Sequence, residues 1–188
     1  HAGKTIWYAP VLGAPLAAFA VHCAAILGAK GVLQIGSFGG TQKGMRPGEL
    51  LLVTAAGRGE GASQWYLPPG EMAYPDEELL ERLRAFLKQK GLSWREAPVF
   101  TTSAFMAETW ADILRWEREG YAGVEMEAAS TFAVAQHLGL PSAALLFLYD
   151  HLIEGQHMTN IPAEERQQVK RMETQLEGLA LEFAVQWA

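Results

Sequence analysis

The stretch GVEMEAASTFAVAQHLGLPSAALLFLYD, residues 123–150, decides the fold class. Its pattern predicts a short strand over 123–126, a strongly apolar helix over about 127–138, and a continuous apolar strand over 142–148 that ends on Tyr149 and Asp150. An uninterrupted apolar run of this length is typical of a strand that is buried on both faces of a sheet. Strand, helix and strand in this order predict an α/β fold with a mostly parallel or mixed sheet flanked by helices.

The same alternation extends outward from this stretch in both directions. The pattern predicts further strands at 5–9, 32–35, 50–54 and 97–101, and further helices at 15–28, 76–90, 108–118 and 163–187. A loop rich in Gly, Ser and Pro at 57–75 is long enough to be functional. Because no repeat, low-complexity tract or linker interrupts the pattern, we expect one domain over 1–188.

Composition narrows the functional class. The chain has 188 residues, of which 49% are hydrophobic and 19% charged, with one cysteine and a formal net charge of −6. These values exclude a disordered chain, a disulfide framework and a cysteine-built zinc site, and they argue against a nucleic-acid or anionic-membrane partner. No apolar run reaches the ~18 residues that a spanning helix needs. We therefore expect a cytoplasmic globular domain. The opening residue, His1, suggests that the initiator Met is gone or that the chain starts partway into a longer gene.

Three segments place polar groups where strands of an α/β sheet are expected to end, which is where ligands bind in such folds. The first is Gly-Ser-Phe-Gly-Gly at 36–40, whose backbone N–H groups and Ser37 hydroxyl could hold an anion, or which could be a plain tight turn. It is neither a dinucleotide fingerprint nor a P-loop.

The other two segments carry carboxylates. Glu125 and Glu127 flank Met126 at the start of an apolar helix, where a charge needs a partner or a task, such as accepting two hydroxyl protons from a ribose diol. The alternative is that they are acids favoured by the helix dipole. Asp150 is the first charge after a long apolar strand, so it is either a proton donor whose pKa is raised by burial or a cap for the next turn.

Together these segments resemble the nucleoside phosphorylase and nucleosidase family, including the hexameric purine nucleoside phosphorylases. The motifs that carry the resemblance occur in order at 36–40 (GSFGG), 47–49 (PGE), 60–63 (EGAS), 123–129 (GVEMEAA) and 149–151 (YDH). The similarity runs from about Leu12 to the C-terminal helix. It implies a nucleoside phosphorylase-like fold and cleavage of an N-glycosidic bond.

The resemblance also implies roles for the nucleoside-binding residues. Met126 and Glu127 would hold the ribose hydroxyls, and Phe105 would stack on the base, although on its own Phe105 reads equally well as a core aromatic. Val124 and Tyr149 would also contact the base. Tyr149 stands where the family usually has Ser, and it could crowd the base or hydrogen-bond to it.

The same resemblance implies which residues contact phosphate and which residue donates the proton. Ser37, Gly36 and Gln34 would contact phosphate, and Asp150 would protonate purine N7 as the glycosidic bond breaks. Gln34 replaces an Arg that phosphorylases of this type carry, so the charge that pairs with phosphate is lost. The family's first strand and Gly-Asp-Pro phosphate loop have no counterpart here, nor does a basic residue from a neighbouring subunit, so the chain reads as short at its start.

Three functional hypotheses follow. The leading one is a purine nucleoside phosphorylase-like glycosyltransferase with phosphate as co-substrate and no cofactor; the absence of the Gln-x-Arg pair of pyrimidine-type members also favours purines. The second is a nucleosidase that uses water, and the third is a non-catalytic nucleoside-binding or assembly relative. The resemblance also implies a homo-oligomer, because members of the family assemble through the faces that complete their sites. We expect no metal site, because His22, His137 and His151 lack carboxylates at ligand spacing. His151 could orient Asp150 or lie on the surface.

Overall fold

The computed structural model describes residues 3–187, so the expectation that rests on His1 lies outside the described part. It contains five strands and five α-helices, and an α-helix separates each pair of consecutive strands except the first two. The strands are β1 Val32–Gly40, β2 Leu50–Arg58, β3 Trp94–Thr101, β4 Gly123–Glu125 and β5 Ser142–Asp150. The helices are α1 Ala14–Ile26, α2 Glu77–Gln89, α3 Trp110–Arg118, α4 Ala128–His137 and α5 Ala163–Trp187, with single 3₁₀ turns at η1 Ser63–Trp65, η2 Phe105–Ala107 and η3 Leu152–Glu154.

The five strands form one mixed sheet that closes on itself in the order β1-β4-β3-β2-β5. β1 pairs in parallel with β5, and β3 pairs in parallel with both β2 and β4. The two remaining contacts, β1 with β4 and β2 with β5, are antiparallel. The α/β class with a mixed sheet and flanking helices, expected from the sequence, is confirmed.

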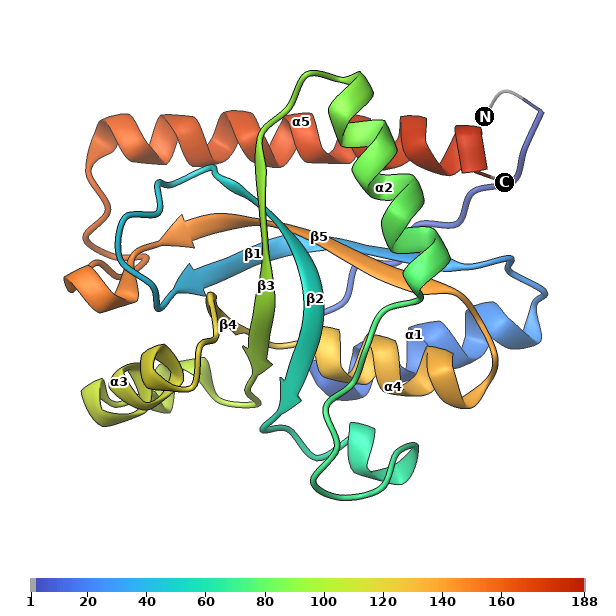
Figure 1. The fold of residues 1–188 in the computed structure, drawn as a ribbon, viewed down its shortest axis with the longest axis horizontal. Coiled ribbons are helices and arrows are strands. Elements are labelled where there is room, and N and C mark those ends of the chain that lie inside the picture. The colour runs from blue at the N-terminus through green and yellow to red at the C-terminus, as the bar shows by residue number, and fades with distance from the viewer. Residues whose placement is uncertain (1–2, 188) are drawn as a thin grey trace.

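Helices cover both faces of the sheet (Figure 1). One core lies between the sheet and α4 and includes Phe132, Leu146 and Leu148, while α1 packs on the outer side of α4. The second core lies under α2 and α5, where Leu83 and Phe183 meet side chains from the opposite faces of β2 and β5. Alternate residues of β5 therefore belong to different cores, which explains its unbroken apolar sequence.

Two predicted local structures differ in the observed fold. Residues 5–9 form no strand; they have no pairing partner in the described chain, and Trp7 and Tyr8 are exposed. Residues 36–40 are not a turn but the second half of β1, because Gly39 pairs with both Val124 of β4 and Asp150 of β5. A side chain at Gly39 would collide with Leu152, so glycine leaves room for the side chain of this η3 residue against β1.

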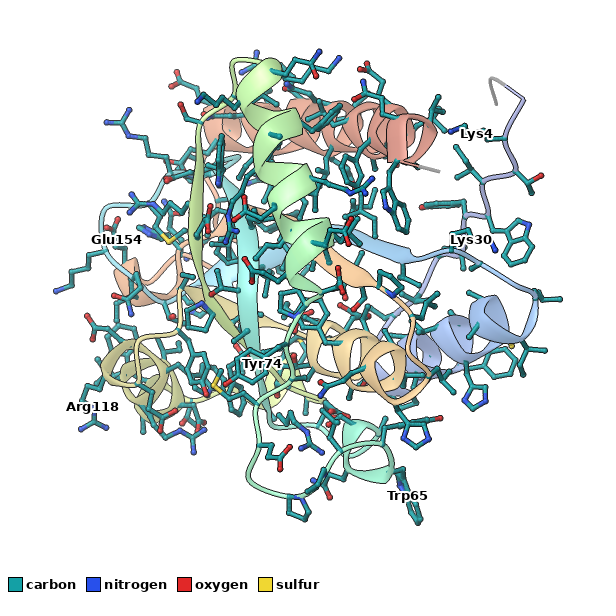
Figure 2. All side chains as sticks on the ribbon, turned by 45° about the vertical axis from the view of Figure 1, so that its right-hand side comes forward. Lys4, Lys30, Trp65, Tyr74, Arg118 and Glu154 are labelled. Carbon is teal, nitrogen blue, oxygen red and sulfur yellow. The ribbon has the colours of Figure 1, made fainter. Side chains whose placement is uncertain are left out.

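The loop predicted at 57–75 begins after Arg58 and contains η1. The Arg58 guanidinium organises it by donating to the backbone carbonyls of Leu67, Pro68 and Glu71. Trp65 projects from the tip of this loop, away from the body of the domain, and is 87% exposed (Figure 2). Within residues 3–187, no helix is long and apolar enough to cross a membrane.

Candidate active site

The carboxylate of Glu125 is buried at the end of β4 and is surrounded by hydrogen-bond donors. Oε2 accepts from the backbone N–H groups of Glu127 at 2.8 Å and Ala128 at 2.7 Å, and from Gln34 Nε2 at 3.2 Å. Oε1 accepts from the Thr101 hydroxyl of the neighbouring strand β3. Glu125 thus satisfies two N–H groups at the start of α4, which would otherwise lack partners inside the protein.

This environment makes Glu125 a structural anchor for α4. Burial raises the pKa of Glu125 to about 7, while the hydrogen bond from Thr101 lowers it and the charge of Glu127 raises it further. The Thr101 hydroxyl oxygen in turn accepts from Ala129 N–H at 2.9 Å, so one side chain supports both the carboxylate and the helix. Both carboxylate oxygens of Glu125, the first acid of the GVEMEAA motif, therefore accept hydrogen bonds from the protein itself.

Glu127 has a different environment. It is half-buried at the N-cap position of α4, and its Oε1 accepts from the backbone N–H of Gly13 at 2.6 Å. Gly13 is the N-cap of α1 and has φ 85°, a conformation that favours glycine. Burial raises the pKa of Glu127, and the N–H groups of Gly13 and Met126 oppose that rise. The contact brings together the starts of two helices that lie 114 residues apart in the chain.

Gln34 lies on β1 and faces Glu125. Its Nε2 donates to Glu125, and its Oε1 is buried with no hydrogen-bond partner among the described residues. An arginine here would add a positive charge beside the carboxylate of Glu125, whereas Gln34 contributes only a neutral amide. An unpartnered buried amide oxygen is an acceptor that a bound ligand or water with an O–H or N–H group could satisfy.

Asp150 ends β5 and is 9% exposed. Burial raises its pKa to about 6, while the nearby His157, the backbone N–H of Met158 and, less strongly, His151 lower it. Below pH 6 the carboxyl is therefore mostly protonated and can donate a proton. Asp150 is the register partner of Gly39 on β1, and Gly39 pairs in turn with Val124 on β4. Asp150 is therefore separated by one strand, β1, from the strand that carries Glu125.

Phe105 and its neighbours form an exposed apolar segment after β3. Phe105 is 42% exposed on η2, Met106 is 81% exposed, and Trp110 at the start of α3 is 52% exposed. This accessibility argues against the alternative that Phe105 is a core aromatic. Val124, in contrast to Phe105, is not accessible: it is buried against Ile113 and Trp116 of α3.

The side chains of two predicted site residues, Ser37 and Tyr149, lie on the face of the sheet opposite to that of Gln34. Leu33 and Ile35 of β1 pack toward α2 and α5, so by strand alternation Ser37 is on their side, whereas Gln34 and Gly36 face the α4 side. Ser37 is exposed. Tyr149 also packs against the core under α2 and α5, away from the Asp150 side of β5. The structure thus brings Gln34, Met126 and Glu127 together but separates them from the side chains of Ser37 and Tyr149.

His151 is buried and both its ring nitrogens are engaged, Nε2 with the Gln42 carbonyl at 3.1 Å and Nδ1 with Glu154 at 3.0 Å. Its ring is therefore held by Glu154 of η3 and by the segment after β1, with no hydrogen bond to Asp150, and it is not a surface residue. No group of three or more His, Cys, Asp or Glu side chains that could hold a metal ion occurs in residues 3–187.

The sequence analysis identified neither Gly13 nor Thr101 as a residue of the site. The helix-start pattern Gly-Ala-Pro is a signal that could have indicated Gly13, whereas no local pattern marks Thr101.

Buried carboxyls with raised pKa values at the ends of β4 and β5, the two strands that flank β1 in an α/β sheet, are features typical of sites that bind and convert small molecules. Comparison with known proteins identifies the family. The sequence model described as "Phosphorylase superfamily" matches residues 2–184. The chain belongs to this superfamily, which confirms the resemblance that its motifs predicted.

Individual relatives are distant. The guanosine phosphorylase of Halorubrum lacusprofundi is 29% identical over 77% of this chain and 60% of its own length, and the DeoD-type purine nucleoside phosphorylase of Shewanella oneidensis is 30% identical over 74% and 59%. The uridine phosphorylase of Vibrio fischeri superimposes with a TM-score of 0.81 at 27% identity, covering 93% of this chain and 71% of that one. An AMP nucleosidase from Bacteroides thetaiotaomicron, at 24% identity and a TM-score of 0.68, shares the fold. The chain matches about three fifths of the length of these curated relatives.

Proposed function

We propose that this protein cleaves the N-glycosidic bond of a purine nucleoside with phosphate as the acceptor. The observation that carries the proposal is Asp150, a buried carboxyl at the end of β5 with a pKa raised to about 6. A neutral carboxyl can donate a proton to purine N7, which turns the base into a better leaving group. The names of the relatives, which include purine nucleoside and guanosine phosphorylases, support the same chemistry.

Glu127 and Phe105 complete the proposed nucleoside site. The transition state of glycosidic cleavage is a ribosyl cation, and a half-buried carboxylate such as Glu127 can both accept the ribose hydroxyls and stabilise the positive charge. Met126 would pack against the sugar, and the exposed ring of Phe105 is available to stack on the base. Val124 and Tyr149, which pack into the protein core, have no part in this version of the site.

Hydrolysis by water is the second candidate, and Gln34 favours it. This side chain is neutral and gives its N–H to Glu125, and its buried Oε1 has no partner within the described chain. A water molecule can donate to such an oxygen without the repulsion that a dianionic phosphate would meet there. In the phosphorolytic reading, phosphate would take a backbone N–H from either Gly36 or Ser37, because neighbouring residues of a strand direct their N–H groups to opposite edges and β5 occupies one edge of β1. The Ser37 side chain would not take part.

A nucleoside panel tests both versions. Inosine, guanosine, adenosine and uridine are incubated with the protein in the presence and absence of phosphate, and the free base and sugar product are quantified by chromatography. Base release that requires phosphate and yields ribose 1-phosphate supports phosphorolysis, while phosphate-independent release of free ribose supports the nucleosidase. No base release from any nucleoside would refute both. Asp150→Asn should abolish turnover, and Glu127→Gln should raise KM; if both variants bind nucleoside and the wild type never turns it over, the protein is a binding relative.

We further propose a homo-oligomer in the cytoplasm. Exposed apolar side chains on and near α1, among them Phe19, Ile26 and Trp65, offer a surface that a second copy could cover. Light scattering measures the mass directly, and a monomer at micromolar concentration would refute this expectation.

A further inference from the structure

Gly13, at the start of α1, has a backbone conformation that residues with a side chain rarely adopt. Its φ is 85° and its ψ is 156°, a region that is almost exclusive to glycine. A Cβ at this position would nevertheless have room, because the nearest heavy atoms beyond its chain neighbours are Met126 Cε at 3.8 Å and Pro15 Cδ at 3.9 Å. The constraint on Gly13 is therefore the conformation of its backbone and not the space around it. Conformations of this kind are concentrated at functional sites.

In this conformation Gly13 joins two helices. Its N–H donates to Glu127 Oε1 at 2.6 Å, while its carbonyl accepts from the N–H groups of Leu16 and Ala17 and so begins α1. The first turn of α1 holds no acidic residue, and glycine has no side chain to cap it. The Glu127 carboxylate therefore lies at the positive end of α1 as well as at the start of α4, and the two helices lie side by side (Figure 1).

Within the described chain, few charged groups act on the Glu127 carboxylate. Glu125 of β4 is coupled to it, since the charge of Glu127 raises the pKa of Glu125. The side chains of β1 and β3 that contact Glu125, an amide and a hydroxyl, are neutral. α1 carries no Asp, Glu, Lys or Arg, and its titratable side chains, His22 and Cys23, lie more than two turns beyond Gly13. Burial raises the pKa of Glu127, and the N–H of Gly13 is the strongest influence that opposes the rise.

We propose that Gly13 is a positioning residue for sugar recognition: its N–H holds the Glu127 carboxylate in the orientation and the ionised form in which it accepts the ribose hydroxyls. This inference rests on the proposed function, which assigns the ribose to Glu127. A carboxylate with one oxygen held by a backbone donor presents its remaining lone pairs in a fixed direction. Because it is oriented in advance, it loses less conformational freedom when a nucleoside binds.

Gly13→Ala tests this role, with Gly28→Ala as the matched control. Gly28 follows the other end of α1, also has a positive φ, 81°, and has no described atom within 4 Å of the position of a Cβ. Alanine at position 13 disfavours a φ of 85° and so moves the N–H away from Glu127. We expect kcat/KM for inosine to fall at least about tenfold in Gly13→Ala and by less than about twofold in Gly28→Ala.

An analogue without the ribose diol separates positioning from damage to the fold. 2′,3′-Dideoxyinosine lacks both hydroxyls that Glu127 would accept, so its inhibition constant as a competitor of inosine should be nearly the same in the wild type and in Gly13→Ala. A parallel loss for inosine and for the dideoxy analogue would show that the substitution acts on the fold as a whole, and it would overturn the proposal. An unchanged kcat/KM for inosine in Gly13→Ala would overturn it as well.

A measurement on the wild type needs neither turnover nor a variant. The chemical shift of an amide proton that is donated to a carboxylate changes as the carboxylate ionises, so NMR of labelled protein should show the Gly13 amide titrating together with the Glu127 carboxyl. In Gly13→Ala the pKa of Glu127 should be higher, because a donor that stabilises the charged form is lost. A Gly13 amide that does not follow Glu127 refutes the proposal. If the wild type releases no base but the two groups titrate together, the proposed function fails and the hold of Gly13 on Glu127 stands.

Discussion

Replacement of Glu125 by Gln should change how the stability of the protein depends on pH. Burial raises the pKa of Glu125 from 4.5 to about 7, so the folded protein holds this proton more tightly than the unfolded chain. The resulting stabilisation is fully present below pH 4.5 and is lost as the pH rises through 7. Gln is isosteric and neutral at every pH, and its oxygen can still accept from the N–H groups that start α4. The stability of the variant therefore does not fall in this way as the pH rises.

The magnitude follows from the two pKa values. A rise from 4.5 to about 7, at about 1.4 kcal/mol per pKa unit, corresponds to about 3 kcal/mol over the whole titration. Between pH 5 and pH 8 the part that is lost is about 2–3 kcal/mol. The pKa values of Asp150 and Glu108 are raised in the same direction, but both groups are present in both proteins and cancel in the difference. The free energy of unfolding of Glu125→Gln, relative to wild type, should thus rise by about 2–3 kcal/mol from pH 5 to pH 8.

Urea unfolding followed by tryptophan fluorescence measures this difference at half-unit steps of pH. Glu173→Gln, on an exposed face of α5, controls for the loss of one surface charge. A Glu125→Gln curve that runs parallel to the wild type from pH 5 to pH 8 would show that Glu125 keeps its charge at no cost in the fold. The reasoning that hydrogen bonds only partly offset its burial would then be refuted.

Two further changes test the same region of the fold. Thr101→Val removes the hydroxyl that binds Glu125 and should lower the free energy of unfolding at pH 8 by about 2–4 kcal/mol in urea titrations, whereas Thr101→Ser should retain most of it. Gly123→Ala would place a methyl group 2.3 Å from Phe38, so thermal unfolding should show a loss of at least about 2 kcal/mol. Gly178→Ala, in a helix with nothing within 4 Å, should instead stabilise the protein by about 0.5–1 kcal/mol. Equal melting temperatures for the two alanine variants would contradict this reading of the glycines.

The helices could be predicted from sequence because their signals are local. The predicted helix 76–90 is observed at Glu77–Gln89, where Asp76 accepts from Leu79 N–H at the start. Strands depend on partners elsewhere in the chain. Residues 5–9 have strand-like side chains but no neighbouring strand among the described residues, and Gly39 looks like a turn residue until β4 and β5 lie against it.

The roles of the site residues could not be predicted from local sequence either. Glu125 and Glu127 are two residues apart and chemically identical, and nothing nearby in the sequence separates their roles. Their roles are set by Thr101, 24 residues before Glu125, and by Gly13, 114 residues before Glu127. The resemblance places Tyr149 at the base, because it stands where the family has Ser before the catalytic Asp, but adjacent residues of a strand point to opposite faces.

The parallel pairing of β1 with β5 has a consequence for synthesis of the chain. About a hundred residues separate Gly40 from the start of β5, and a ribosome needs about 5–20 s to add them. Throughout that interval one hydrogen-bonding edge of β1 awaits β5, and the other awaits β4, which is made only shortly before. A nascent chain therefore exposes an apolar, unpaired strand for seconds, and we expect its yield in cells to depend on chaperones that shield such edges.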